Sequence, residues 1–220
     1  MNNALSLTAV ATLAASLCLS TAQAESKNDE AFFEIQGQFE LVQPPQPTAS
    51  PDKVEVKEVF WYGCPHCFRF EPSLLRWEKN IPEYVEFLRM PAVLRDSWAP
   101  HARAYHTANV LGVSHAIHQP LYDAIHVGRQ KLDTRESLMS FFAEHGVDKK
   151  AFAGTYDSFG VESKLRQSRA MTRGYGIHGV PAVVINGKYR TSGSLAGSFK
   201  GMLRVVDILV ERERAAMAAN

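Results

Sequence analysis

The sequence predicts an α/β fold in which a long block of helices divides the strands into two groups. An extended apolar segment from Val54 leads into Cys64-Pro65-His66-Cys67, and a helical run follows. Five helical segments, punctuated by glycines, fill most of residues 96–175. A proline, a short apolar strand and a hairpin turn at Asn186-Gly187 come next, before a final helix. Strands and helices mixed in this way favour a sheet covered by helices.

The first 24 residues are typical of a secretory signal peptide. They contain no Lys, Arg, Asp or Glu, and residues 4–19 form an apolar run. Ala22-Gln23-Ala24 then supplies a small-x-small cleavage signal. An uncleaved membrane anchor is the alternative, but the run is short for a bilayer span. We therefore expect export and a mature chain that begins at Glu25, with Cys18 removed.

Cys64 and Cys67 are the two cysteines of that mature chain. One closely spaced pair does not make a disulfide scaffold, so a chemical role is the better interpretation. Half of a zinc site is the alternative, but zinc takes four ligands and no cysteine follows Cys67. His115 and His118 could share a helix face, and we expect them to be structural or on the surface. No metal and no cofactor are expected.

Cys64 lies between the end of the predicted strand and a helix that is predicted at residues 68–79. The start of a helix has unpaired N–H groups and a partial positive charge, which favour an anion such as a thiolate. The thiolate is the form that attacks disulfides. Cys67 lies one turn further on, where it can reach Cys64 and release a bound partner. Pro65 suits the first helical turn, and a protonated imidazole at His66 would stabilise the thiolate.

The strand expected at residues 54–62 carries an acid, Glu58, on its more apolar face. Successive side chains of a strand point to opposite faces. Four other residues share the face of Glu58: Val54, Val56, Phe60 and Tyr62. Burial raises the pKa of a carboxyl group, so Glu58 is a candidate proton carrier beneath the cysteines.

The remaining elements are predicted from periodicity and from glycine and proline breaks. Further strands are expected at residues 39–42, 84–90, 180–185 and 188–191. Helices are expected at residues 99–111, 114–127, 134–145, 149–159, 162–175 and 199–216. The chain then divides into a signal peptide (1–24), a domain built from residues 25–95 and 176–220, and an inserted helical domain (96–175). The formal net charge of +1 gives no indication of nucleic-acid binding.

The order strand, Cys-x-x-Cys, helix, strand and late proline hairpin resembles the thioredoxin fold, with the helical block as an insertion. Three features resemble the DsbA family of periplasmic thiol oxidases: Pro65-His66 between the cysteines, Gly179-Val180-Pro181, and Glu58 six residues before Cys64. This resemblance covers nearly the whole mature chain. It implies an enzyme that introduces disulfide bonds into exported proteins through a redox-active Cys64–Cys67 disulfide. A disulfide isomerase or reductase on the same fold is the first alternative, and a non-catalytic peptide- or zinc-binding module is the second.

The resemblance also implies partners and further site residues. The Val180–Pro181 bond would be cis and lie beside the active-site sulfur, with the neighbouring backbone pairing with the substrate. Arg89 stands where the family often has Lys near the buried acid. Because Arg does not release its proton, any relay would depend on Glu58. The implied partners are reduced exported polypeptides and a quinone-linked membrane reoxidase of the DsbB type, with no nucleic acid, and we expect a periplasmic monomer.

Overall fold

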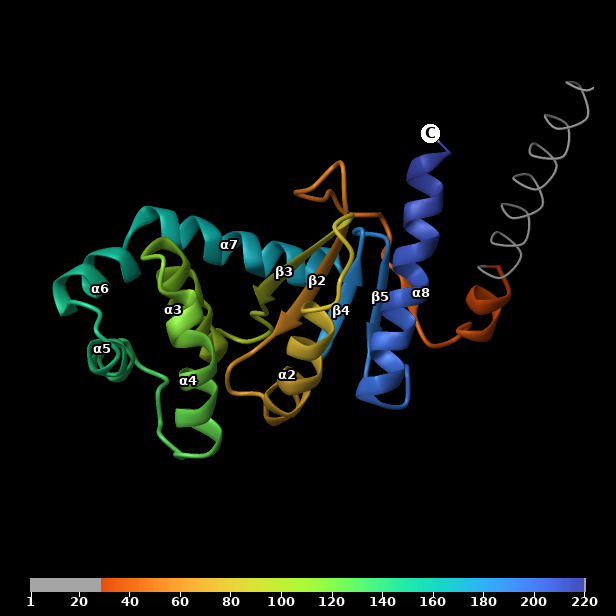
Figure 1. Ribbon diagram of the computed structural model, residues 1–220. Coiled ribbons are helices and arrows are strands. Elements are labelled where there is room, and N and C mark those ends of the chain that lie inside the picture. The colour runs from red at the N-terminus through yellow and green to blue at the C-terminus, as the bar shows by residue number, and fades with distance from the viewer. Residues whose placement is uncertain (1–28, 220) are drawn as a thin grey trace, which may run out of the picture.

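The computed structural model describes residues 29–219, so the expected signal peptide and the start of the mature chain at Glu25 lie outside the described residues. A five-stranded sheet with the order β1-β5-β4-β2-β3 forms the centre (Figure 1). Its strands are β1 (Glu40–Leu41), β2 (Val54–Phe60), β3 (Val85–Pro91), β4 (Ala182–Ile185) and β5 (Tyr189–Ser192). β2 runs parallel to β3, and the other neighbouring pairs are antiparallel.

Two helices pack on the sheet and a helical insertion extends to one side of it (Figure 1). The packing helices are α2 (Pro65–Glu78) and α8 (Phe199–Ala218). The insertion, between β3 and β4, comprises η1 (Asp96–Trp98), α3 (Ala99–Val110), α4 (Ser114–His126), α5 (Arg135–Glu144), α6 (Lys149–Tyr156) and α7 (Phe159–Gly174). Within residues 29–219, no helix combines the length and the apolar composition needed to cross a bilayer.

β2 is an inner strand of the sheet, between β4 and β3, and all seven of its residues are buried. Val54 and Val56 belong to the core that includes Phe70 of α2 and Val205 of α8. Val59 packs instead in the core that contains Tyr175, just beyond α7. The two faces of β2 therefore bury different cores, as the period of two predicts. The polar residues of the second face are also buried, which the alternation alone did not indicate.

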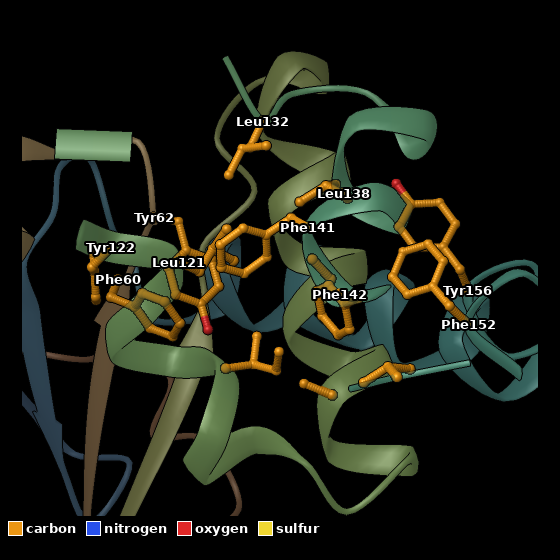
Figure 2. Packing of buried hydrophobic residues seen from close by; sticks show 14 of the residues in the cluster. Phe60, Tyr62, Leu121, Tyr122, Leu132, Leu138, Phe141, Phe142, Phe152 and Tyr156 are labelled. Carbon is orange, nitrogen blue, oxygen red and sulfur yellow. The ribbon is translucent and has the colours of Figure 1, made fainter. Parts of the chain in front are cut away.

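A third core joins the end of β2 to the insertion (Figure 2). Phe60 and Tyr62 enter a cluster of aromatic residues that includes Tyr122 of α4, Phe142 of α5 and Phe152 of α6. Phe60 and Tyr62 meet edge to face, with their ring centroids 5.1 Å apart. Such buried aromatic pairs add about 0.5–1.5 kcal/mol beyond the burial of their area. The insertion therefore packs against the segment that carries Cys64 and Cys67, which belong to the same cluster.

The predicted elements are all present, with shifted ends. The strand expected to reach Tyr62 ends at Phe60, because the chain turns there and the N–H of Cys64 bonds to the carbonyl of Trp61 at 2.9 Å. The helix expected from residue 68 already begins at Pro65. α7 begins at Phe159 rather than at residue 162, because Ser158 caps it through the N–H of Val161. Local capping contacts thus set ends that periodicity does not resolve.

Candidate active site

Cys64 is the N-cap of α2, and its sulfur accepts a hydrogen bond from the backbone N–H of Cys67 at 3.4 Å. Pro65 occupies the first helical turn, where its missing N–H is not needed. Both cysteines are free thiols, and Cys67 is fully buried whereas Cys64 is 7% exposed. The prediction that Cys64 starts the helix and Cys67 lies a turn inside it is confirmed.

The two thiols have opposite shifts in pKa. A hydrogen bond from the Cys67 thiol, followed by the backbone N–H groups of Cys67 and His66, lowers the pKa of Cys64 to about 6 despite partial burial. Burial raises the pKa of Cys67 far above its ordinary value, and the neighbouring Cys64 raises it further. At neutral pH the stable thiolate is therefore Cys64, which is also the more accessible sulfur.

His66 lies on the exposed side of the first turn of α2, with its ring Nδ1 2.9 Å from a guanidinium nitrogen of Arg69. The backbone N–H and the charge of His66 both lower the pKa of Cys64, and this charge is the smallest of the causes that act on that pKa. The stabilisation we predicted for the imidazole therefore has the expected direction but is secondary to hydrogen bonding within the Cys64–Cys67 pair.

The Val180–Pro181 peptide bond is cis, as predicted, and a second cis bond that was not predicted lies at Gln43–Pro44. The Cys64 thiol donates to the carbonyl oxygen of Val180 at 3.4 Å. This contact brings together two segments that are 116 residues apart in the chain. A hollow of about 790 Å³ lies along the segment that contains Val180 and Pro181. His66 and Phe199 also line this hollow.

Glu58 is completely buried on β2, as the strand alternation predicts. Burial, reinforced by the negative charge of Glu71, raises the pKa of Glu58 to about 8, and Arg89 opposes this rise. Arg89 Nε lies 3.3 Å from Glu58 Oε2, and its terminal nitrogen donates to both Glu71 and Glu78 at 3.0 Å. A neutral carboxyl at pH 7 can donate a proton to a nearby thiolate.

His118, which the sequence left as a structural or surface residue, reaches this buried cluster from α4. Its Nε2 lies 3.5 Å from Glu71 Oε1, and its Nδ1 lies 2.8 Å from the hydroxyl of Tyr62. The N–H of His126, from the last turn of α4, donates to the carbonyl of Tyr62 at 2.7 Å. His115 is exposed and is not part of the cluster. No local sequence signal indicates Glu71 or His118, because only the folded chain brings α2 and α4 together.

Two unlike thiols in one Cys-x-x-Cys turn, placed against a cis-proline loop, give the fold the chemistry of a thiol:disulfide oxidoreductase. A family model described as a DSBA-like thioredoxin domain matches residues 84–199, from β3 through the whole insertion to the start of α8. The chain belongs to the DsbA family, and it is a thiol:disulfide oxidoreductase that introduces disulfide bonds.

Relatives and solved structures agree with this family. The chain is 42% identical over 194 residues to a thiol:disulfide interchange protein DsbA of Azotobacter vinelandii, covering 88% of this chain and 90% of the relative. It is 41% identical over 172 residues to the DsbA of Pseudomonas aeruginosa, covering 78% and 82%.

The crystal structure of Pseudomonas aeruginosa DsbA matches with a TM-score of 0.79 at 39% identity, covering 82% of this chain and 94% of that one. That of Xylella fastidiosa DsbA matches with a TM-score of 0.76 at 35% identity, covering 81% and 96%. The predicted thioredoxin-like fold with a helical insertion is therefore confirmed.

Proposed function

We propose that Cys64 is the sulfur through which this enzyme exchanges disulfides with its substrates, and that Cys67 is the resolving thiol. The observation that carries this proposal is the asymmetry of the pair. Cys64 caps the helix and has a pKa of about 6, whereas Cys67 is fully buried with a raised pKa. The better-stabilised thiolate is the better leaving group, and it is also the sulfur that a partner can reach.

In the oxidising direction, a substrate thiolate attacks Cys64 of the Cys64–Cys67 disulfide. The S–S bond breaks, its electron pair goes to Cys67, and a mixed disulfide between Cys64 and the substrate forms. A second substrate thiolate then attacks the substrate sulfur of that mixed disulfide. Cys64 leaves as a thiolate, so the substrate gains a disulfide and the enzyme ends as a dithiol. The low pKa of Cys64 favours this last step.

Glu58 supplies the proton that Cys67 needs when it becomes the leaving thiolate. A carboxyl with a pKa of about 8 is largely protonated at pH 7, and its charge is among the influences that raise the pKa of Cys67. Transfer of the proton leaves the carboxylate next to Arg89, which is 3.3 Å away and keeps its charge. The carboxyl regains its proton from solvent before the next turnover.

The substrate binds as an extended segment against the backbone of Val180. The contact between this residue's carbonyl and the Cys64 thiol supports that role, because a strand paired with Val180 would pass directly over the sulfur. Pro181 lines the adjoining hollow of about 790 Å³, which can take an apolar substrate side chain.

The setting that fits this chemistry is the periplasm, with reduced exported polypeptides as substrates. The small-x-small signal at Ala22-Gln23-Ala24 supports export. A quinone-linked membrane protein of the DsbB type would reoxidise the Cys64–Cys67 pair, and the enzyme would act as a monomer. Residues 96–175 would form an inserted helical domain, and residues 25–95 with 176–220 the thioredoxin-like domain.

Trapping of mixed disulfides tests the assignment of the two sulfurs. Cys67→Ser, incubated with reduced exported proteins, should accumulate complexes through Cys64 that dissolve on addition of a thiol reductant. Cys64→Ser is the matched control and should trap nothing. Equal trapping through Cys67 in the control would reverse the assignment. A reduction potential close to that of a reductase, about −270 mV, would contradict the oxidising direction.

A further inference from the structure

Cys64 borders a second, smaller hollow of about 390 Å³ on the side that faces the segment before η1. Trp61, Trp98, Leu94, Arg95 and His178 line it together with Cys64. We call it the tryptophan hollow. It shares His178, Gly179 and Val180 with the larger hollow, so the cis-proline loop forms the ridge between the two. A peptide lying on that ridge would have side chains to place on both sides.

The wall of the tryptophan hollow is apolar and held in place. The indoles of Trp61 and Trp98 are stacked with their centroids 4.2 Å apart and their planes within 3°. Trp61 also rests on the backbone of Gly63, where an added Cβ would come within 2.3 Å of the indole ring. Only a glycine therefore lets the indole pack this closely against the active-site loop. Leu94 extends the apolar lining and remains partly exposed.

The rim of the tryptophan hollow is positively charged and unpaired. The Arg95 side chain is exposed and makes no hydrogen bond or ion pair with any residue in the described part of the chain. Its neighbour Asp96 is engaged elsewhere, 2.9 Å from Arg169. His178 is likewise exposed and without a partner among residues 29–219. No Asp or Glu lines this hollow, so an anionic group from outside would meet no opposing charge there.

We propose that the tryptophan hollow binds the side chain of an acidic substrate residue within two positions of the cysteine that attacks Cys64. The carboxylate would pair with Arg95, and the aliphatic stem of a glutamate would lie along the stacked indoles. Adjacent side chains of an extended peptide point to opposite sides, so a strand on Val180 directs some neighbours of its cysteine toward each hollow. This inference deepens the proposed function, because it rests on Cys64 as the attacked sulfur.

The test compares oxidation of matched dithiol peptides by the oxidised full-length enzyme. Each peptide carries Glu, Gln or Lys at one of the two positions on either side of its first cysteine. We expect kcat/KM to be about three- to fivefold higher for Glu than for Gln at one or more positions, the range of a well-placed exposed ion pair. At about 1 M salt the Debye length is about 3 Å, so the preference should largely disappear.

In Arg95→Ala, the ratio of kcat/KM for the Glu peptide to that for the Gln peptide should fall to about one. The value for the Gln peptide itself should stay within twofold of wild type. Arg95→Glu should reverse the preference toward Lys. Lys150→Ala, which removes an exposed cation from α6, is the matched control and should keep the wild-type ratio. The ratio also cancels any general effect of the substitutions on the Cys64 thiolate.

A Glu to Gln ratio near one at all four positions, or a ratio unchanged in Arg95→Ala, would overturn the proposal. Failure of wild type to oxidise any of the peptides would instead count against the proposed function itself.

Discussion

Glu58 and Arg89 are register partners on the parallel strands β2 and β3, and Arg89 Nε lies 3.3 Å from Glu58 Oε2. This proximity does not keep Glu58 ionised. Neither carboxylate oxygen accepts a hydrogen bond within residues 29–219, whereas Arg89 donates to Glu71 and Glu78. Burial then outweighs the attraction, and the pKa of Glu58 is about 8. Arg89 thus offsets the negative charges of Glu71 and Glu78, while Glu58 stays protonated at pH 7.

The first prediction concerns stability. A carboxyl whose folded pKa of about 8 exceeds the unfolded value of about 4.3 makes the fold less stable as pH rises between those two values. Glu58→Gln removes this penalty. The variant should therefore gain stability over wild type between pH 4 and pH 8, with little difference at pH 4. Urea unfolding at pH 4, 6 and 8 measures it, with the exposed Glu83→Gln as control. A stability difference that does not change with pH would contradict the assignment.

The second prediction tests the link from α4 to the buried acids. His118 and Arg89 are the two basic neighbours that lower the pKa of Glu71 against the effect of burial, and the negative charge of Glu71 raises the pKa of Glu58. His118→Gln should therefore raise the titration midpoint of Glu71 above its wild-type value.

Carboxyl resonances of isotopically labelled glutamates report this midpoint directly. His115→Gln, on the exposed side of the same helix, serves as the control. Equal midpoints in wild type and His118→Gln would show that the imidazole 3.5 Å from Glu71 does not influence the pair.

A third prediction concerns the thiolate. The pKa of Cys64, about 6, lies below its ordinary value, so the reduced fold gains stability as pH rises from about 6 toward about 8.5. That gain is lost as pH falls through 6. Reduced protein should therefore melt above oxidised protein at pH 7, and the difference should shrink below pH 6.

His66→Ala should raise the midpoint of thiolate absorbance, yet leave it below that of a free cysteine. The reason is that the hydrogen bonds within the Cys64–Cys67 pair come before the charge of His66 among the causes of the low pKa. Gln at this position keeps a polar side chain and separates loss of charge from loss of bulk. A midpoint near 8.5 in both variants would make His66, rather than the pair, the main determinant.

The parts of the site that the sequence predicts are those set by local chemistry. Cys64 as a helix start follows from N-terminal capping, and Glu58 facing the core follows from the period of a strand. Glu71 and His118 could not be found in this way, because their meeting depends on how α4 packs against α2. The Trp61–Trp98 stack likewise joins the loop before α2 to η1, 37 residues further along the chain, and neither segment carries a sequence signal for it.

The strands of the sheet were also predicted from local patterns, but the burial of the less apolar face of β2 was not. Alternation along β2 placed Glu55 and Lys57 on the less apolar face, yet both are buried there. Tyr175, following α7, covers this face together with the loop before β2. Such cover comes from distant segments, so a strand that looks half exposed in sequence becomes fully buried in the fold.

The last prediction concerns this buried ion pair. Lys57 Nζ lies 2.6 Å from Glu55 Oε1 and 3.0 Å from the hydroxyl of Tyr175, while Glu55 Oε2 accepts from the N–H of Ala49 at 2.9 Å. Lys57→Met would leave the carboxylate buried without a cation, which costs about 3–5 kcal/mol of unfolding free energy. Adding Glu55→Gln removes that charge but keeps an acceptor for Ala49, so the double variant should recover most of the loss. Denaturant unfolding of both variants at pH 7 measures this. If the double variant is as unstable as Lys57→Met, the loss comes from packing of the lysine stem rather than from the unpaired charge.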